Sequence, residues 1–431
     1  MNHLSPLNLL QLVPEPLPTF RADVSVLFGK YLPRHGVQCH IVGMPGGDMN
    51  NQDFASVRRS YPAKGRWSRE LSYLLLCLRA LLGTRQKSCD LIQVRDMVSI
   101  GLLAMLIARL KGIPFVFWIS YLMTEGRIER SRASIDAGAG FRSRLVLLKG
   151  LVEKALLYRL VLPGARHVFV QSEAMKELIA ARGIPLNKLT AVPMGVDTET
   201  LQFGSVRKQR LPGWEEVPLI AYLGTLDRMR RLHEVIDALA IVKARHPQAR
   251  LLFIGNSLDR SDTVNLLEHA KRLGLDDSVH VTGWLPTSQA WALLAGADAT
   301  VSFFPRGEIL DTNSPTKLLE YLALGLPCVG NDNPDQAQVL SASGAGWLTD
   351  STIEALAQAL CEILDDPEAA RKRAASGPAY INAVRSYEVL ASKVAEQYRL
   401  IAAASCAPVP DSKATNHFMG EGAYDSTNEK S

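Results

Sequence analysis

The sequence contains few cysteines, and they form no recognisable motif. Six occur in 431 residues, at positions 39, 77, 89, 328, 361 and 406, with neither a C-x-x-C pair nor the spacing of a zinc site. This pattern excludes a cysteine-based metal centre and a disulfide framework. It favours a reducing compartment, where thiols stay unpaired.

Long apolar runs and a leader segment are also missing. The most apolar stretches, residues 97–108 and 113–119, are too short to cross a bilayer. The first residues lack the charged start and the apolar core of a signal peptide. We therefore expect a cytoplasmic protein that is soluble or, at most, bound peripherally to the inner face of the cell membrane.

The chain has no strong excess of charge of either sign. Its formal net charge is +5, from 48 lysines and arginines and 43 acidic residues. Such a small excess does not favour a nucleic-acid partner, although it is compatible with anionic ligands or an anionic membrane surface. Hydrophobic residues make up 47% of the chain, which is enough for the cores of two domains.

Strand-like apolar runs alternate with helical stretches in both halves of the chain. In the first half, strands are predicted at 9–13, 37–42, 91–94, 114–119 and 167–171, and helices at 24–33, 69–82, 99–111, 142–160 and 173–182. In the second half, strands are predicted at 218–223, 250–254, 279–282, 299–304 and 327–329, and helices at 232–245, 263–273, 288–295, 315–324, 353–364 and 367–375. This alternation predicts parallel sheets covered by helices on both faces.

A polar, basic stretch at 198–216 predicts the junction between two domains. We place a Rossmann-like domain at 1–195, a second one at 196–385, a closing helix at 386–404 and a disordered tail at 405–431. The loop at 14–20 is rich in proline and has no glycine. The glycine fingerprint that cradles the phosphates of a nucleotide is therefore absent from the first domain.

The stretch 304–327 combines a strand end, a polar loop and a helix with clear boundaries. Ser314 is a good N-cap, Pro315 suits the first helical position, and Gly325 marks the stop. Lys317 stands where a capping box would have a glutamate, at the positive end of the helix dipole. An anion bound at this helix start would explain the cation. Alternatively, Lys317 and Glu320 belong to the solvated face of an ordinary surface helix.

A second basic helix start lies in the predicted crevice of the same domain. In a doubly wound sheet, ligands bind at the switch point, here between the first and fourth strands of the second half. The two loops at this point, 225–231 and 306–313, lead into Arg230 and Arg231 in one case and Lys317 in the other. Two such starts indicate a shared polyanion such as a diphosphate.

Six ordered motifs resemble the nucleotide-sugar-dependent glycosyltransferases of family 4, which act in bacterial polysaccharide assembly. These motifs are HVFVQSE at 167–173, VPMGVD at 192–197, AYLGTL at 221–226, LLFIG at 251–255, VHVTG at 279–283 and SPTKLLEYLALGLPCV at 314–329. The resemblance implies the GT-B fold, in which two Rossmann-like domains face each other across a cleft and the C-terminal helix packs back towards the first domain.

The resemblance also implies roles for individual residues. Glu320 would hold the ribose hydroxyls of the donor. Arg230, with Arg228 nearby, and Lys317 would grip the diphosphate, and Trp284 would lie over the nucleobase. Trp284 is equally well explained as a half-buried structural anchor. The donor-binding set is completed by Thr225, Gly255 and Ser314.

The chain departs from the family pattern at several positions. The usual first glutamate, eight residues before Glu320, is Thr312, and Asp311 is the nearest substitute for the contact with the transferred sugar. The histidine often found near the donor sugar appears as Ser120. Arg21, Arg95 and Asp96 follow strands and face the predicted cleft, where they could serve the acceptor together with Ser120. Each could equally be a loop charge in water.

The family implies transfer with retention of configuration from a UDP- or GDP-sugar, without a metal or a bound cofactor. The acceptor would be a glycan or a polyprenyl-linked sugar. Two alternatives stay open: a nucleotide-sugar epimerase of the same fold, and a non-catalytic nucleotide-sugar-binding subunit, which the missing carboxylate at Thr312 would suit.

A basic amphipathic stretch spans residues 142–159. It spaces Arg142, Arg144, Lys149, Lys154 and Arg159 among leucine, valine and tyrosine residues, a pattern typical of a helix on a membrane surface. The alternative is a domain helix with a solvated face.

Overall fold

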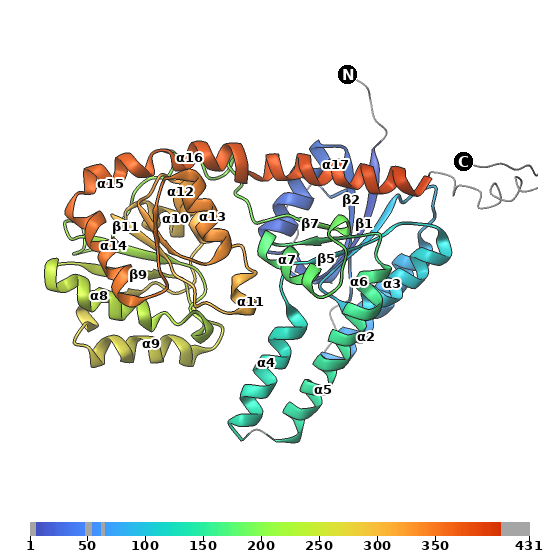
Figure 1. Ribbon diagram of the computed structural model, residues 1–431, viewed down its shortest axis with the longest axis horizontal. Coiled ribbons are helices and arrows are strands. Elements are labelled where there is room, and N and C mark those ends of the chain that lie inside the picture. Colours follow the sequence, from blue (N-terminus) through green and yellow to red (C-terminus); the bar gives the residue numbers. More distant parts are fainter. Residues whose placement is uncertain (1–5, 48–53, 62–64, 139, 407–431) are drawn as a thin grey trace, which may run out of the picture.

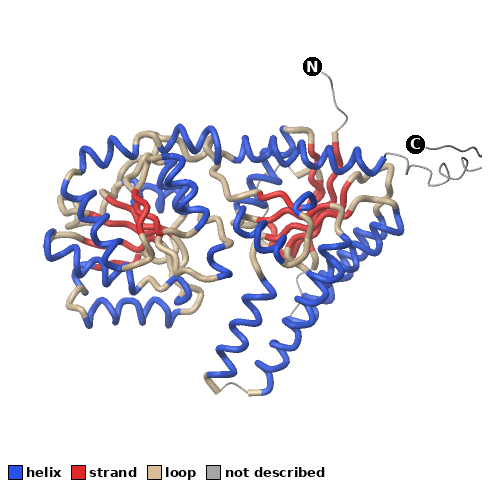
Figure 2. The backbone as a smooth tube through the Cα atoms, in the orientation of Figure 1, coloured by secondary structure: helices blue, strands red, loops and turns tan. Residues whose placement is uncertain are grey.

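The chain folds into two α/β domains joined in mid-sequence (Figure 1). The computed structural model describes residues 6–47, 54–61, 65–138 and 140–406. The tail predicted from residue 405 lies outside the described residues from 407 onwards. Within each domain the strands form one central sheet with helices on both faces (Figure 2).

The N-terminal domain is built on a seven-stranded sheet in the order β3-β2-β1-β4-β5-β6-β7, and every pairing is parallel. The strands are β1 (Leu7–Leu17), β2 (Val37–Pro45), β3 (Ser56–Arg59), β4 (Leu91–Arg95), β5 (Phe115–Ile119), β6 (His167–Val170) and β7 (Leu189–Ala191). Successive residues of β1 pack into different cores, Leu9 on one face and Leu10 on the other. A sheet buried on both faces follows from such continuous apolar runs.

Helices cover both faces of this sheet. They are η1 (Asp23–Tyr31), α1 (Leu32–Arg34), α2 (Arg66–Gly83), α3 (Val98–Lys111), α4 (Met123–Asp136), α5 (Phe141–Leu156), η2 (Leu157–Val161), α6 (Leu162–Gly164), α7 (Glu173–Ala181) and η3 (Leu186–Lys188). The sequence analysis missed α4, which has a low apolar content, and the short strands β3 and β7.

The C-terminal domain has a six-stranded parallel sheet in the order β10-β9-β8-β11-β12-β13. Its strands are β8 (Leu219–Leu223), β9 (Arg250–Ile254), β10 (Val279–Val281), β11 (Ala299–Ser302), β12 (Cys328–Asn331) and β13 (Trp347–Thr349). Its helices are η4 (Arg228–Arg230), α8 (His233–Arg245), α9 (Arg260–Arg272), η5 (Asp276–Ser278), α10 (Thr287–Ala295), α11 (Glu308–Asp311), α12 (Thr316–Ala323), α13 (Pro334–Ser343), α14 (Ile353–Asp365), α15 (Pro367–Ala374), α16 (Gly377–Tyr380) and η6 (Ile381–Arg385). The elements β13, α11 and α13 were not predicted.

The last helix, α17 (Tyr387–Cys406), returns to the N-terminal domain and lies along it (Figure 1). Leu390, Val394 and Tyr398 pack into the same core as Leu9 and Phe28. The hydroxyl of Tyr398 also donates a 2.6 Å hydrogen bond to the side chain of Gln93. The crossing of α17 ties the two domains together.

Candidate functional site

The switch point of the C-terminal sheet lies where the sequence predicts it, and we call the region around it the crevice. Strands β8 and β11, the first and fourth of this domain, are neighbours and pair through Ile220 and Ala299. Gly224 follows β8 and Gly255 follows β9, each with a positive φ, of 138° and 142°. A Cβ atom on Gly255 would lie 2.0 Å from the carbonyl oxygen of Gly224. The two loops therefore meet backbone to backbone, which only glycine permits.

Lys317 lies at the start of α12 and is only 7% exposed. Its Nζ atom lies 4.2 Å from the centre of the Phe304 ring and 4.6 Å from that of Tyr222. Within the described part of the chain, no carboxylate lies within ion-pair distance of this ammonium. Burial, followed by the charge of Arg230, holds the pKa of Lys317 well below its usual range.

Arg230 joins Lys317 from the opposite side of the crevice. Its guanidinium Cζ lies 4.7 Å from the centre of the same Phe304 ring, and its Nε lies 3.5 Å from a carboxylate oxygen of Asp227. The predicted pair of cations from two separate loops is therefore brought together. Arg231 instead turns to Glu234 in the first turn of α8, and it is not part of the cluster.

Glu320 lies one turn further along α12. Its Oε1 atom accepts a 3.3 Å hydrogen bond from the indole Nε1 of Trp291 on α10. Burial raises the pKa of Glu320 to about 7, although this hydrogen bond and the charge of Lys317 work in the opposite direction. Lys317 and Glu320 thus line one side of the site, as their spacing of three predicts.

The prediction that Ser314 caps α12 is wrong. The helix begins at Thr316, and no side chain caps it. The Ser314 hydroxyl donates to Asp335 at 2.7 Å and accepts the backbone N–H of Met194 at 3.0 Å. A buried carboxylate such as Asp335 requires donors, and this need outweighs the local capping preference.

The predicted stop of α12 is confirmed. Gly325 has a left-handed φ of 64°, and its N–H donates to the carbonyl of Leu322 at 3.0 Å. At its other end, no side chain caps α12, so the first-turn N–H groups have no side-chain partner from the cap position. These groups are a suitable partner for an anion.

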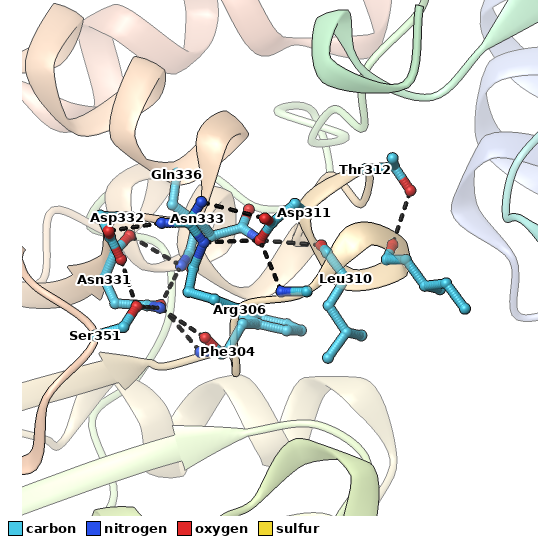
Figure 3. A network of polar contacts seen from close by, with 12 residues as sticks. Phe304, Arg306, Leu310, Asp311, Thr312, Asn331, Asp332, Asn333, Gln336 and Ser351 are labelled. Carbon is cyan, nitrogen blue, oxygen red and sulfur yellow. Dashed lines mark hydrogen bonds and ion pairs between the residues drawn. The ribbon is translucent and has the colours of Figure 1, made fainter. Parts of the chain in front are cut away.

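Asp311 belongs to an ion-pair network (Figure 3). Its two oxygens accept from Arg306 at 2.8 and 3.1 Å, and Arg306 also binds Asp332 at 2.6 Å. The adjacent Thr312 is 2% exposed and donates to the carbonyl of Ile309. Its own carbonyl accepts from Ser172 of the N-terminal domain at 2.7 Å. The loop that carries the family's first carboxylate thus connects the two domains in this chain.

The remaining donor-side candidates surround the crevice. Trp284 follows β10 and is 58% exposed. Thr225 follows Gly224, and its carbonyl accepts from the Tyr222 hydroxyl at 3.3 Å. Arg228 is the first residue of η4, and Arg231 follows directly after that short helix.

The acceptor candidates of the N-terminal domain form one cluster. The hydroxyl and backbone N–H of Ser120 both donate to Asp96, and Nη2 of Arg21 lies 3.4 Å from the Ser120 hydroxyl. Asp96 has a left-handed φ of 56° at the end of β4, beside the switch point of this sheet. Burial raises the pKa of Asp96 in spite of its neighbour Arg95.

Arg95 is the most buried member of this cluster, with no exposed surface. Its guanidinium donates to Glu15 at 3.0 Å and to Asp23 at 2.5 Å. The alternative that these residues are loop charges in water is wrong for Arg95 and Asp96, which are buried within a charge network. It holds in part for Arg21, whose side chain is 46% exposed.

Three aromatic residues of the site were missed from the sequence. Tyr222 and Phe304 face the two cations, and Trp291 binds Glu320. Tyr222 stands next to last in β8 and Phe304 follows β11 by two residues, so the only available signal was an aromatic at the carboxyl end of each switch-point strand. An aromatic at a strand end is more often part of the core than of a binding site.

The described ranges contain neither a candidate metal centre nor a candidate membrane-spanning helix. They contain no group of three or more histidine, cysteine or acidic side chains that could hold a metal ion. Nor does any helix within them have the length and apolar character needed to cross a membrane.

Two family models match consecutive parts of the chain. The model described as Glycosyltransferase Family 4 matches residues 24–200, and the one described as Glycosyl transferases group 1 matches residues 207–379. The first falls on the N-terminal domain, and the second contains the crevice with Arg230, Lys317 and Glu320.

Curated relatives share about a quarter of the aligned residues. WcaL of Salmonella typhimurium, which is named for glycosyltransfer in colanic acid biosynthesis, is 26% identical over 235 residues, covering 53% of this chain and 54% of its own. A GDP-mannose-dependent alpha-(1-6)-phosphatidylinositol monomannoside mannosyltransferase of Mycobacterium tuberculosis is 26% identical over 239 residues, 54% of this chain and 60% of its own. The chain thus spans little more than half the length of these relatives.

Solved structures resemble the chain over almost its whole length. A glycosyltransferase from Rickettsia africae has a TM-score of 0.67 at 14% identity, covering 92% of this chain and 99% of its own. Anabaena HepE in complex with UDP and glucose has a TM-score of 0.65 at 15% identity, covering 91% and 100%. At such low identity the similarity establishes the arrangement of the two domains and no more.

Proposed function

The chain belongs to the family 4 glycosyltransferases, which have the GT-B fold, and from this premise we propose that it transfers a sugar from a nucleotide-diphosphate donor. The acceptor is a glycan or a lipid-linked sugar in exopolysaccharide, lipopolysaccharide or capsule assembly. One observation carries the proposal. Two cations from separate loops, Arg230 and Lys317, share one aromatic ring in the crevice, and the carboxylate of Glu320 lies one turn away.

The cation pair suits the leaving group of the reaction. Negative charge develops on the departing diphosphate, and preorganised cations in a site with little water stabilise that charge strongly. Lys317 has no carboxylate partner among the described residues, so its charge is available to an anion. In this scheme Glu320 accepts hydrogen bonds from the ribose hydroxyls, and Trp284 lies over the base.

Transfer with retention needs no separate protein base in this scheme. An oxygen of the leaving diphosphate takes the proton of the acceptor hydroxyl while domain closure excludes water. Asp311 stays our candidate for the contact with the transferred sugar. Both of its oxygens bind Arg306, and because a carboxylate has about four acceptor sites, it can still accept from a sugar hydroxyl.

We assign the acceptor to the carboxyl ends of the strands of the N-terminal sheet. Arg21 is the exposed member of the cluster there and reaches the hydroxyl of Ser120. Beneath them, Arg95 is held by the carboxylates of Glu15 and Asp23, and Asp96 pairs with Arg95. In this arrangement Arg21 and Ser120 contact the acceptor, and the buried pair fixes their positions.

A nucleotide screen tests the proposed function. We expect a UDP- or GDP-sugar to raise the melting temperature by several degrees in a thermal-shift assay, since a ligand at 100 times its Kd adds about 2.7 kcal/mol of stability. The matching nucleoside monophosphate should have a smaller effect, because it lacks the second phosphate between Arg230 and Lys317. No shift with any nucleotide sugar would contradict the proposal.

Product analysis separates the two rival functions. A donor that is converted to another sugar nucleotide without an acceptor would indicate an epimerase. A donor that binds but is neither hydrolysed nor transferred to any acceptor would indicate a binding subunit.

The surface of α5 supports a location at the membrane. Helices α4 and α5 form a hairpin that projects from the N-terminal domain (Figure 1). Phe141, Leu145, Leu148 and Val152 form a stripe at helical spacing, each between 49% and 72% exposed. The opposite face of α5 packs on α4, with Gly150 against Ile128. The stripe therefore lacks a partner within the described chain.

Arginines flank this stripe. Among the residues that the structure describes, Arg142, Arg144 and Arg159 are in no ion pair, whereas Lys154 binds Glu125. An apolar stripe bordered by unpaired cations is the pattern of a helix in the interface of an anionic bilayer. We infer that α5 contacts the membrane that carries the acceptor.

Liposome flotation tests the membrane contact. The protein should float with vesicles containing anionic lipid, and the double change Leu145→Glu and Leu148→Glu should lower the bound fraction at least about fivefold, because each glutamate removes apolar contact and repels anionic headgroups. Leu267→Glu on α9, where the leucine is 39% exposed, is the matched control and should bind like the wild type. Absence of wild-type binding to anionic vesicles would remove the membrane from the proposal.

A further inference from the structure

Both cations of the crevice contact the ring of Phe304. This residue is 2% exposed and follows β11, and the Nζ of Lys317 and the Cζ of Arg230 lie 4.2 and 4.7 Å from its ring centre. The ring of Tyr222 adds a second contact to Lys317 at 4.6 Å. We refer to the rings of Phe304 and Tyr222 as the aromatic seat. Ring faces carry partial negative charge, so they attract cations even in a desolvated site.

Unlike an ion pair, the aromatic seat leaves the positive charge of the ammonium available to a ligand. A carboxylate beside Lys317 would neutralise the ammonium and would repel an incoming diphosphate. An aromatic face attracts the ammonium and leaves its full charge in place. In the described chain, Asp227 is the only carboxylate within ion-pair distance of Arg230, at 3.5 Å, and Lys317 has none. The two cations are thus held together without their charges being neutralised.

The backbone of Phe304 is itself held by a buried side chain. Asn331, at the end of β12 and with no exposed surface, accepts the N–H of Phe304 at 3.0 Å and donates to its carbonyl at 2.6 Å (Figure 3). Gln336 donates to the same Asn331 oxygen at 2.9 Å. This double contact fixes the chain beyond the last paired residue of β11, Ser302. The backbone from which the Phe304 ring extends is thereby held in place.

We propose that Phe304 is a positioning residue, oriented by Asn331, which holds Lys317 and Arg230 at the spacing that grips the donor diphosphate. The proposal rests on the proposed function of the same site. Phe304 need not touch the donor. It acts through the two cations, and without the ring they would separate under their mutual repulsion.

Several charged groups face Lys317 and set how it titrates. Arg230 lowers its pKa, whereas Asp227 and Glu320 raise it, and burial has the largest effect of all. Tyr222 is neutral in the accessible range, since burial raises its pKa. The seat favours the charged ammonium, so loss of the Phe304 ring should lower the pKa of Lys317 further. As the pH rises, the variant should therefore lose diphosphate binding at a lower pH than the wild type does.

The test compares two identical changes at adjacent residues. Phe304→Leu should weaken binding of whichever of UDP and GDP the wild type prefers by about tenfold, measured by calorimetry, and should shift the alkaline limb of the binding profile to lower pH. Phe303→Leu is the matched control, because Phe303 is equally buried but packs into the core with Val301 and Phe253. If both variants bind nucleotide equally well, the proposal is overturned.

A fluorinated ring at position 304 tests the role of the ring without the risk that a smaller side chain disturbs the fold. Replacing Phe304 by 3,4,5-trifluorophenylalanine keeps the shape of the ring and withdraws charge from its face. We expect binding to weaken about fivefold with an unchanged melting temperature. Native affinity in this variant would show that the ring only fills space.

Lys317→Met separates failure of the seat from failure of the function. If Lys317→Met binds the nucleotide like the wild type, the diphosphate site itself is misplaced. If Lys317→Met loses binding while both ring variants keep it, the site stands and the positioning role of Phe304 is rejected.

Discussion

Replacing Lys317 by methionine is expected to lower kcat by a factor of about 10² to 10³, because removal of one preorganised group that stabilises transition-state charge has effects of this size. Of the two cations, Lys317 is the one without a carboxylate partner among the described residues, so its charge is the less compensated of the two at the leaving diphosphate. Steady-state kinetics with the donor identified by the nucleotide screen measures the effect.

The same change should not destabilise the fold. The methionine side chain keeps the apolar contacts of the lysine stem, and the buried ammonium is lost. A lysine whose pKa is lowered on folding costs stability at low and neutral pH, and this cost disappears as the pH rises towards the unfolded value of 10.5. Lys317→Met should therefore melt at an equal or higher temperature than the wild type at pH 7, and the difference should shrink towards pH 10.

An exposed lysine provides the control for this experiment. Lys271→Met on α9 should change neither turnover nor melting temperature, because Lys271 is exposed and outside the crevice. Near-normal turnover in Lys317→Met would place the diphosphate elsewhere in the chain.

Replacing Glu320 by glutamine is expected to weaken donor binding about 100-fold above pH 7, since hydrogen bonds to a charged group contribute about 1.5–3 kcal/mol each. The ribose hydroxyls donate to the carboxylate, and a neutral amide accepts more weakly. Because the pKa of Glu320 is about 7, donor affinity of the wild type should rise as the pH increases from 6 to 8. Calorimetry at these pH values measures both effects, with Glu320→Gln as the reference that lacks the titrating carboxylate.

Glu320→Gln should also stabilise the protein in an alkaline buffer. The folded pKa is raised from 4.5 to about 7, so the ionised carboxylate costs folding energy above pH 7 and nothing below pH 4.5. The glutamine can still accept from Trp291 and has no charge to bury. We expect a gain of about 2 kcal/mol at pH 8 that vanishes near pH 4.5.

Glu268→Gln on α9 is the control for the stability measurement, since Glu268 is exposed. If Glu320→Gln and Glu268→Gln have the same melting temperature at pH 8 and the same donor affinity, Glu320 is an ordinary surface carboxylate. A gain in stability with a loss of binding is what a residue selected for function at the expense of the fold would show.

Local features of the sequence were sufficient for the frame of the molecule. Apolar runs of strand length alternate with amphipathic stretches, and parallel sheets with short connections are the arrangement that buries such runs. The order of β8 and β11 follows from the same topology. The cation pair was accessible in part, because Lys317 stands in the first turn of α12, where the dipole disfavours it, although Arg230 ends η4 and precedes α8 by three residues. A residue that is locally unfavourable points to a partner outside its own helix.

Other features depended on contacts between distant segments. Ser314 satisfies every local rule for an N-cap, but Asp335 lies beside it in the fold and takes its hydroxyl. Arg95 follows a strand and could have faced water, but Glu15 and Asp23 enclose it. No spacing along the chain encodes these encounters. The hairpin of α4 and α5 was missed for a related reason, since α4 is held by ion pairs such as that of Glu125 with Lys154 more than by an apolar face.

The sequence alone determined the two-domain fold and the switch point between β8 and β11, because hydrophobic period and helix-end chemistry act over a few neighbouring residues. The tertiary structure alone decided that Phe304 holds Lys317 and Arg230 together, that Trp291 binds Glu320, and that the Thr312 loop reaches across to Ser172. Each of these contacts joins segments that meet only after the sheets have formed, and their energies depend on burial, which no local pattern records.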